Sequence, residues 1–251
     1  MERAGTGRLS FGITAGPRPW LAALGGSVER LGYATLWTND TRGRSAAAAL
    51  APLGAAPRTL GLAIGVAALS DRTPEAIADD LERSGLPLDR LVIGVGSGAS
   101  RSLALVRAGV AGLRALLPGQ PIAVAAVGPR MCRLAGEIAD LVLLNWARPD
   151  RIEWARERVA SGAATAGRPA PTVAAYVRVA LGPGARERLE REAARYARRS
   201  PWYAEVLAER DAAPVGVAVE ESDEVRERLA MALDPYRAVL DETVVRGLPG
   251  S

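Results

Sequence analysis

Short apolar runs alternate with longer amphipathic segments along almost the whole chain. In the short runs, apolar residues are continuous or fall at every second position, which predicts β-strands. In the segments between them, apolar residues recur every three or four positions, which predicts helices. The predicted strands lie at residues 9–14, 34–38, 59–66, 91–96, 122–127, 141–146, 173–181 and 243–246. This alternation indicates a parallel α/β sheet, closed or open, and eight strands favour a closed (β/α)8 TIM barrel in a single domain, 1–251.

Some of the predicted helices begin at residues with strong positional preferences. Pro129, directly after Gly128, predicts the first residue of a helix at the end of a strand. Asp150, with Glu153 three residues later, predicts the capped start of another helix. The long segment 185–233 is predicted to be helical.

The end of the sequence bears on assembly. Only residues 247–251 follow the last predicted strand, so we expect the barrel to lack the final C-terminal helix of the ring. Strands eight and one are then expected to expose apolar outer faces, and each Val- or Leu-sized side chain left in water forfeits roughly 1.5–3 kcal/mol. We therefore expect a second copy to cover this face in a homodimer. The alternative is that helices of segment 185–233 fold back over it.

Composition narrows the chemistry. The sequence contains no histidine and no lysine, so all 32 basic residues are arginines, and it contains one cysteine, Cys132. Ser-His-Asp and Cys-His triads, a lysine Schiff base and a Walker-type P-loop are therefore excluded. A zinc site is not expected either, and we predict no metal. Carboxylate chemistry and chemistry supplied by a cofactor remain.

Charge and hydropathy indicate the partners. The net charge is +4, but the acidic residues are interleaved with the arginines, and no block of like charges with interleaved aromatics appears. We expect a solvated surface and no nucleic-acid partner. No apolar stretch approaches the roughly 20 residues of a membrane span, and the N-terminus does not resemble a signal peptide. A cytoplasmic protein that acts on a small molecule is the expectation.

The carboxyl ends of barrel strands form the active face of such folds, and two of them are candidate ligand cradles. Gly128 and Pro129 place backbone N–H groups at a helix N-terminus, where a phosphate is favoured, and Arg130 could add a bidentate contact. A tight strand–helix turn is the alternative. The glycine run 94–98 allows a ligand to approach the backbone closely, but its spacing is not that of a dinucleotide fingerprint.

Four segments in order carry a family resemblance. Residues 31–40, 59–66 with 72–75, 88–98, and 125–140 running on to Asn145 and Trp146 resemble the corresponding stretches of luciferase-like, flavin- or deazaflavin-dependent oxidoreductases. The methylene-tetrahydromethanopterin-reductase-like branch is the most similar. The resemblance implies a luciferase-like barrel that binds FMN or the deazaflavin coenzyme F-420.

The resemblance also implies site residues. Gly65–Val66 would be a non-prolyl cis peptide that supports the isoalloxazine ring. Asn39 and Asp40 would stand near the reactive edge of the ring as the catalytic candidates. The residues implied to line the phosphate and the ribityl chain are Gly96, Ser97, Gly98, Val127, Gly128, Pro129 and Met131.

Two positions depart from the family pattern. Thr41 stands where many members carry a histidine, and Ala99 and Ser100 stand where several deazaflavin enzymes have a glutamate. Asp40 is the substitute proton-handling group that we expect, and a cap or turn residue before Gly43 is the alternative.

Three further residues are candidates for contact with the substrate. Arg178 and Arg246 could reach the pocket and bind an anionic substrate, or could form structural ion pairs. Trp146 could floor the substrate pocket or pack under the following loop. The sequence thus favours an oxidoreductase that performs hydride transfer or monooxygenation of a small organic substrate. The alternative is a non-catalytic or cofactor-free barrel that serves as a binding or partner subunit.

Overall fold

The computed structural model describes residues 7–15, 18–41, 43–54, 59–198, 201–208, 215–220 and 223–248. Strands and helices alternate in the order that the hydrophobic pattern predicts. The elements are β1 (Arg8–Thr14), α1 (Arg18–Arg30), β2 (Thr35–Asn39), α2 (Ala46–Gly54), β3 (Gly61–Ala68), α3 (Pro74–Ser84), β4 (Leu91–Gly96), α4 (Leu103–Leu116), β5 (Ile122–Ala125), α5 (Pro129–Ile138), β6 (Leu141–Asn145), α6 (Pro149–Thr165), β7 (Thr172–Leu181), α7 (Ala185–Ala197), α8 (Pro201–Ala208), β8 (Val217–Val219), α9 (Val225–Val239) and β9 (Glu242–Gly247).

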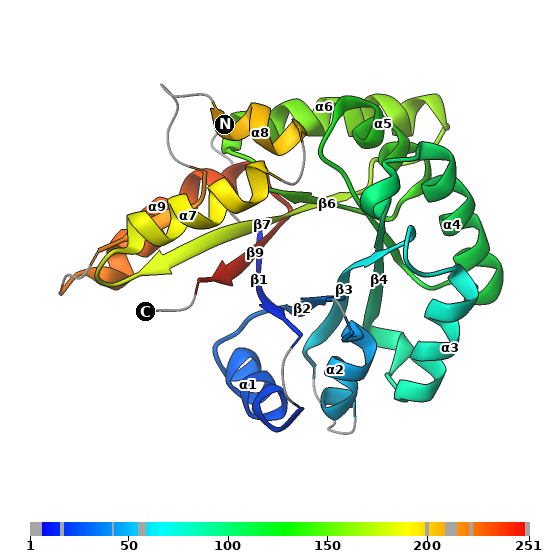
Figure 1. Ribbon diagram of the computed structural model, residues 1–251, viewed down its shortest axis with the longest axis horizontal. Coiled ribbons are helices and arrows are strands. Elements are labelled where there is room, and N and C mark those ends of the chain that lie inside the picture. Colours follow the sequence, from blue (N-terminus) through cyan, green and yellow to red (C-terminus); the bar gives the residue numbers. More distant parts are fainter. Residues whose placement is uncertain are drawn as a thin grey trace.

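Eight of the strands close into a barrel (Figure 1). Each strand from β1 to β7 pairs in parallel with the next, β7 pairs with β9, and β9 pairs with β1. The ring therefore has the order β1–β2–β3–β4–β5–β6–β7–β9, and helices α1 to α6 lie outside it. This architecture confirms the predicted (β/α)8 barrel.

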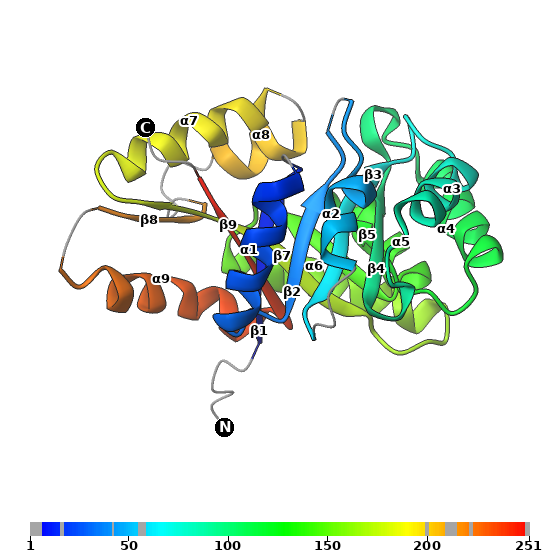
Figure 2. The ribbon, with the colours of Figure 1, turned by 90° about the horizontal axis from the view of Figure 1, so that it is seen from below.

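The ninth strand, β8, lies outside the ring. It pairs with the last three residues of the long strand β7, beyond the part of β7 that pairs with β6. Helices α7 and α9 cover this two-stranded extension from opposite sides (Figures 1 and 2). Segment 185–233, predicted to be helical, thus consists of helices interrupted by a short strand.

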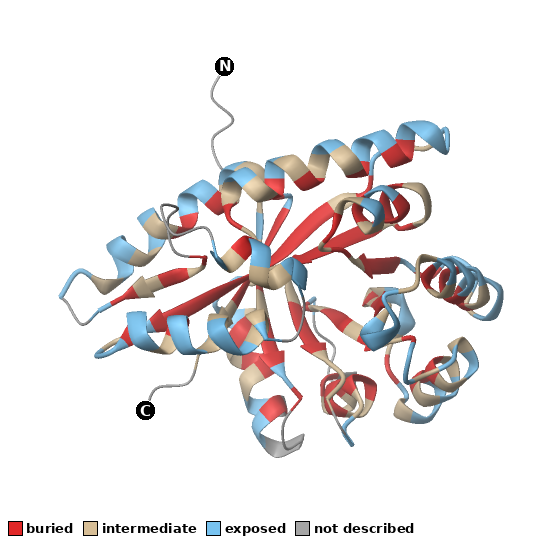
Figure 3. Ribbon diagram, turned by 45° about the horizontal axis from the view of Figure 1, so that its top comes forward, coloured by how far each residue is buried: buried red, intermediate tan, exposed pale blue. Residues whose placement is uncertain are grey.

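Two layers make up the barrel part of the core, a third apolar cluster lies around Trp146 beside α7 and α8, and most strand residues are buried (Figure 3). The larger layer fills the space between the strands and the surrounding helices. The smaller layer fills the barrel interior and consists of Trp37, Ala63, Ala123, Leu141, Leu143, Ala174, Tyr176 and Val244. The indole N–H of Trp37 donates a 2.7 Å hydrogen bond to the buried carboxylate of Glu242, so this buried donor has an acceptor.

The start of α6 differs from the prediction. Its N-cap is Arg148, and Asp150 lies within the first turn with a side chain that is 70% exposed. Proline is well accommodated at the first helical position, and Pro149 occupies it, so the cap must be the residue before it. Asp150 instead pairs with Arg148 across 3.4 Å, where its charge suits the N-terminal end of the helix.

The outer faces of β9 and β1 are less exposed than the sequence suggested. Thr243 and Val245 on β9 are buried, and Phe11 on β1 is half-buried with its ring 5.5 Å from that of Tyr33. Helix α9 packs against β8, β9 and α6, so the structure follows the alternative in which a preceding helix folds back over this face. The described chain ends at Leu248, just after β9. Homodimer formation stays a prediction.

Across the described ranges, none of the helices combines the length and the apolar character that a membrane span requires.

Candidate functional site

Two cavities open at the carboxyl ends of the barrel strands. The first has a volume of about 500 Å³ and lies between the segments that follow β4 and β5 and helix α8. The second has a volume of about 670 Å³ and lies between the segments that follow β2 and β3 and helix α3. Val66 lines both, so the two cavities meet at the end of β3.

Most residues that the sequence implied for a cofactor lie together in the first cavity. Seven of the nine are in its wall, namely Val66, Gly96, Ser97, Gly98, Val127, Gly128 and Met131. Pro129 is the first residue of α5, directly after Gly128. Gly65 precedes Val66, and the peptide bond between them is cis.

Gly65 is tightly enclosed by the barrel interior. A Cβ atom at this position would lie 2.6 Å from Trp37 and 2.6 Å from the hydroxyl oxygen of Tyr176, so only glycine fits. The same hydroxyl donates a hydrogen bond of 2.8 Å to the carbonyl oxygen of Gly65. Burial raises the pKa of Tyr176 to about 12, which keeps this hydroxyl a donor. Trp37 of β2 and Tyr176 of β7 thus hold the backbone at Gly65 from inside the barrel.

The first cavity has the features of an anion site at one end. Gly128 is the N-cap of α5 and makes no side-chain cap hydrogen bond, so free N–H groups of the first turn face this end. Arg101 and Arg130 contribute to the same wall. Trp202 of α8 packs over Gly128, where an added Cβ would lie 2.9 Å from the indole ring. The lining of the first cavity thus combines a helix N-terminus, two arginines and an aromatic side chain over Gly128.

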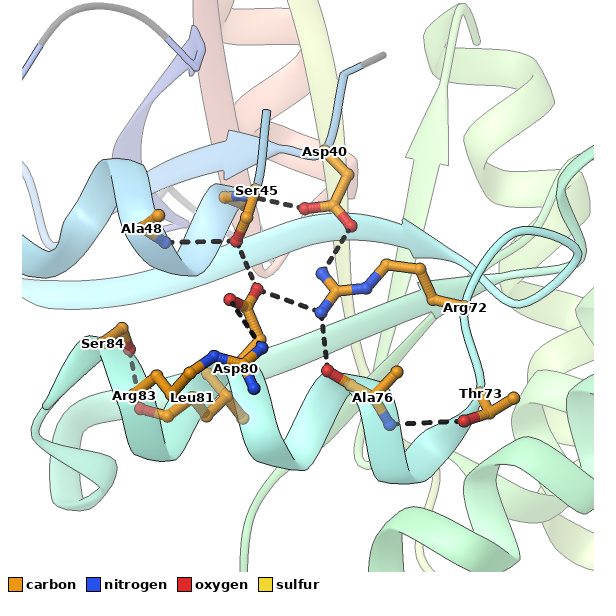
Figure 4. Close-up of polar contacts among 11 residues, drawn as sticks. Asp40, Ser45, Ala48, Arg72, Thr73, Ala76, Asp80, Leu81, Arg83 and Ser84 are labelled. Carbon is orange, nitrogen blue, oxygen red and sulfur yellow. Dashed lines mark hydrogen bonds and ion pairs between the residues drawn. The ribbon is translucent and has the colours of Figure 1, made fainter. Parts of the chain in front are cut away.

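Asp40 lines the second cavity, but both of its carboxylate oxygens already have partners (Figure 4). Oδ1 accepts a 2.7 Å hydrogen bond from the backbone N–H of Ala46 at the start of α2. Oδ2 accepts a 3.1 Å hydrogen bond from Arg72. Asp40 is therefore a cap for α2 and one partner of an ion pair, which is the alternative that the sequence left open. Its proton-handling role stays a prediction.

Arg72 connects the second cavity to helix α3. Its guanidinium group also binds Asp80 at 3.0 Å and the carbonyl oxygen of Ala76 at 2.8 Å, and the hydroxyl of Ser45 donates to Asp80 over 2.5 Å (Figure 4). Burial lowers the pKa of Arg72, but its hydrogen bond and charge interaction with Asp40, and then those with Asp80, outweigh burial and raise the pKa. The wall of this cavity is a preformed network of two carboxylates around one permanent cation.

Asn39 points toward β9. Its amide N–H donates a 2.8 Å hydrogen bond to the backbone carbonyl of Asp40, and its Oδ1 accepts a 2.9 Å hydrogen bond from Arg246. Arg246 also donates to the hydroxyl of Thr14 over 2.8 Å. Asn39 therefore holds Arg246 in place at the barrel mouth.

Arg178 lies next to Arg246 and is almost completely buried. The two residues are register partners on β7 and β9, and Arg178 is only 2% exposed. Its Nη2 donates to the hydroxyl of Tyr196 over 3.3 Å, and Nη1 has no hydrogen-bond partner in the described chain. Burial, and then the charge of Arg246, lower the pKa of Arg178. No carboxylate of the described residues pairs with either arginine, so neither forms the structural ion pair considered from the sequence.

Trp146 belongs to the same neighbourhood. It is 1% exposed, its ring lies 5.3 Å from that of Tyr196, and the Arg178 guanidinium lies 5.0 Å from its centre. Its φ of 53° is in the left-handed region, which costs energy for a bulky residue and aims the indole under α7. Trp146 lines neither of the two large cavities, and its ring packs against Tyr196 of α7 rather than against the loop that directly follows it. Its contact with a substrate stays a prediction.

The residues that sequence reasoning missed come mainly from α7 and α8. Trp202 and Tyr203 line the first cavity, and Tyr196 contacts Arg178. One signal was available, because adjacent aromatics at 202 and 203 are unusual in a chain that is only 4% aromatic. Thr41 and Ala99, two of the positions that depart from the pattern of the resemblance, line the second and the first cavity respectively.

Comparisons with known proteins agree on one group. The family described as luciferase-like monooxygenase has a sequence model that matches residues 97–250. An F-420-dependent secondary alcohol dehydrogenase, solved with an F-420–acetone adduct, has a TM-score of 0.73 at 13% identity, over 98% of this chain and 94% of that one. A coenzyme F-420-dependent tetrahydromethanopterin reductase from Methanopyrus kandleri has a TM-score of 0.65 at 19% identity, over 96% and 95%.

An FMN-binding enzyme is also similar in structure. The oxygenating constituent of 3,6-diketocamphane monooxygenase from Pseudomonas putida, a type II Baeyer–Villiger monooxygenase solved in complex with FMN, has a TM-score of 0.66 at 14% identity. The match covers 94% of this chain and 91% of that one. At these identities the three structures share the fold with this chain, and their ligands and reactions are their own.

Proposed function

The chain belongs to the luciferase-like monooxygenase family, and we propose that it is an oxidoreductase that binds coenzyme F-420 or FMN. Its reaction would be hydride transfer to, or monooxygenation of, a small organic substrate. The observation that carries the proposal is the first cavity, where seven of the nine residues implied for cofactor binding lie in one wall. Its volume of about 500 Å³ lies within the roughly 300–1,000 Å³ of small-molecule and cofactor sites.

The residues present fit such a cofactor. The N-terminus of α5 with Arg101 and Arg130 would hold the phosphate, and the glycine-rich turn after β4 would allow the ribityl chain to lie against the backbone. The ring would then lie over Val66, where the second cavity meets the first, and a substrate would reach it from there. When bound, the cofactor supplies the electron pair for hydride transfer or monooxygenation, chemistry that cofactors rather than protein side chains carry.

This chain's own groups would position the reactants and handle the proton. Tyr176 holds the Gly65 carbonyl and thereby the backbone under the ring. Asp40 is the proposed proton-handling group, since it directly follows β2 and lines the second cavity, which shares Val66 with the first. Two of the structural neighbours, by their descriptions, use F-420 and one binds FMN, which supports either cofactor.

Equilibrium titration of the purified protein with FMN, reduced FMN and coenzyme F-420 tests the proposal. We expect one of them to bind with micromolar affinity. Arg130→Gln should weaken that binding about tenfold or more, because a charge-assisted hydrogen bond contributes roughly 1.5–3 kcal/mol. Arg133→Gln is the matched control, since it removes the same charge from α5 at a position outside the cavity wall. Absence of binding for all three compounds would refute the proposal and favour a cofactor-free barrel.

A further inference from the structure

Two arginines stand side by side at the mouth of the barrel without a carboxylate partner among the described residues. We propose that Arg178 and Arg246 form an oxyanion-binding subsite that holds the acidic group of the substrate. The substrate class is a small organic acid that carries a carboxylate, sulfonate or phosphate group. The claim that this subsite holds a substrate rests on the proposed function. The claim that it binds an anion rests on Arg178 and Arg246 alone.

Arg178 and Arg246 lie on the same strand faces as Tyr176 and Val244, which fill the barrel interior. Arg178 and Arg246 face each other on adjacent strands, and their guanidinium carbons lie 5.5 Å and 5.0 Å from the ring centre of Tyr176. The hydroxyl of that tyrosine binds the carbonyl of Gly65, and the next residue, Val66, is the wall shared by the two cavities. Arg246 also binds Asn39, the neighbour of Asp40 in the second cavity. The cation pair therefore stands beside the place where substrate and cofactor would meet.

The electrostatic environment of Arg178 is unusual for this protein. Arg72 has two carboxylate partners, and the buried Arg148 pairs with Asp150 and donates to a backbone carbonyl. Arg178 is more deeply buried than either, yet its register partner on β9 is another arginine and no carboxylate of the described residues pairs with it. Glu242, the acidic residue of β9, lies at the opposite end of that strand and is bound to Trp37 and Arg8. Two like charges held together in a low-dielectric environment are costly unless an anion neutralises them.

Neutral groups around the pair do not complete its hydrogen bonding. The rings of Trp146, Tyr176 and Tyr196 lie 5.0–5.5 Å from the Arg178 guanidinium and offset part of its charge. They leave Nη1 without an acceptor, and the indole N–H of Trp146 is a second buried donor without one. Buried donors are nearly always paired, so two unpaired donors in one cluster indicate a missing acceptor. An oxyanion supplies several acceptor lone pairs and a negative charge together.

The phosphate of the cofactor is another possible source of an oxyanion, but it has a separate cradle. Arg101, Arg130 and the start of α5 follow β4 and β5, whereas the arginine pair lies on β7 and β9. In the barrel, β6 separates the two regions. The experiment must nevertheless distinguish an anion that binds beside the cofactor from one that takes the place of its phosphate.

Titration of the cofactor-free protein with sodium sulfate and sodium benzoate at constant ionic strength tests the subsite. Tryptophan fluorescence reports binding, because Trp146 lies beside Arg178. We expect saturable binding in the millimolar range or tighter, weakened at least tenfold in Arg178→Gln and much less in Arg178→Lys. Arg191→Gln, which removes an exposed arginine of α7, is the matched control and should bind like wild type. Arg246→Gln provides a second test should Arg178→Gln fail to fold.

The same titrations in the presence of saturating FMN or coenzyme F-420 identify the source of the anion. Benzoate binding that persists beside the cofactor supports a substrate subsite. Competition between benzoate and the cofactor, non-saturable binding, or equal binding by Arg178→Gln and wild type would each overturn it. Cofactor affinity in Arg178→Gln should stay within about twofold of wild type. A protein that binds benzoate through Arg178 but none of the cofactors would refute the proposed function and leave the anion site standing.

Discussion

Asp40 joins two elements of the fold at the edge of a cavity. Its two oxygens are divided between the first turn of α2 and Arg72, so the carboxylate joins two elements while it borders the second cavity. Such a residue is fixed in position before any substrate binds. Its orientation then depends on Arg72, which Asp80 holds from the other side.

We predict that Asp40→Ala and Asp40→Asn differ in their effect on stability. Alanine removes the cap acceptor and the partner of Arg72, which should lower the free energy of unfolding by about 2–3 kcal/mol. Asparagine keeps an oxygen for the Ala46 N–H, and its cost should be about 1 kcal/mol. Urea denaturation measures both, with the exposed Glu187→Ala as control. Turnover of the folded asparagine variant should also fall, since an amide does not exchange protons as a carboxylate does; equal stability losses for the two variants would contradict the capping role.

For single residues, the sequence predicts glycines that a turn or helix start requires, but it does not predict side-chain contacts between segments that are far apart in the chain. Gly96, Gly98 and Gly128, which the resemblance implied for a cofactor, are visible because strand ends and helix starts have local signatures, and all three line one cavity. The surroundings of Arg178 are not visible. Tyr196 reaches it from α7, and Trp146 from the end of β6, through packing that no spacing in the sequence encodes. The pairing of Arg178 with Arg246 depends in turn on the register of β7 and β9.

At the scale of elements, α5 and α6 pack with their backbones in direct contact. An added Cβ at Gly136 would overlap the carbonyl of Val159, and one at Gly162 would overlap the carbonyl of Arg133. The two glycines thus form a reciprocal contact that brings α6 onto the helix whose N-terminus borders the first cavity. The position of the proposed phosphate cradle depends on this packing.

We predict that Gly162→Ala destabilises the protein by about 2–4 kcal/mol, as other overpacked core positions do. Helix propensity alone would change stability by about 1 kcal/mol in the opposite direction, so the sign of the effect identifies the cause. Gly112→Ala on α4 is the control, because its Cβ would meet only the ring of Pro74 at 3.0 Å. Thermal and urea denaturation measure both variants. A neutral or stabilising Gly162→Ala would mean that the two helices can separate at little cost.

The length and periodicity of each element explain which helices and strands could be predicted from the sequence. Long periodic segments bounded by Gly and Pro were found, as with α5 after Gly128. The strand β8 was not, because three residues carry too little pattern to distinguish a strand from a helix, and its pairing with β7 comes from tertiary contacts. The start of α6 was placed late because Asp150 satisfies a capping pattern that Pro149 overrides.

At the scale of the whole molecule, burial shifts the pKa of tyrosines in several elements: Tyr176 lies in the barrel interior, whereas Tyr236 on α9 and Tyr33 before β2 pack in the outer layer. Burial raises the pKa of Tyr176 to about 12 from an ordinary value of 10.0, and burial also raises the pKa of Tyr236 and Tyr33. A group whose pKa is higher in the folded state stabilises the fold fully below the pKa of the unfolded state. That contribution is lost as pH rises through the folded pKa.

We therefore predict that the free energy of unfolding falls as pH rises from about 10 to about 12. For Tyr176, a shift of about two units corresponds to roughly 2–3 kcal/mol, and Tyr236 and Tyr33 add to the same trend. Urea denaturation at several alkaline pH values measures this slope, and ultraviolet absorbance follows the formation of tyrosinate. Tyr176→Phe loses a hydrogen bond and is less stable at neutral pH, but its slope should be shallower because one raised pKa is gone. If the free energy of unfolding fell equally steeply with pH in the two proteins, Tyr176 would ionise as readily in the folded as in the unfolded chain. The Tyr176 hydroxyl would then not be a buried donor to the Gly65 carbonyl.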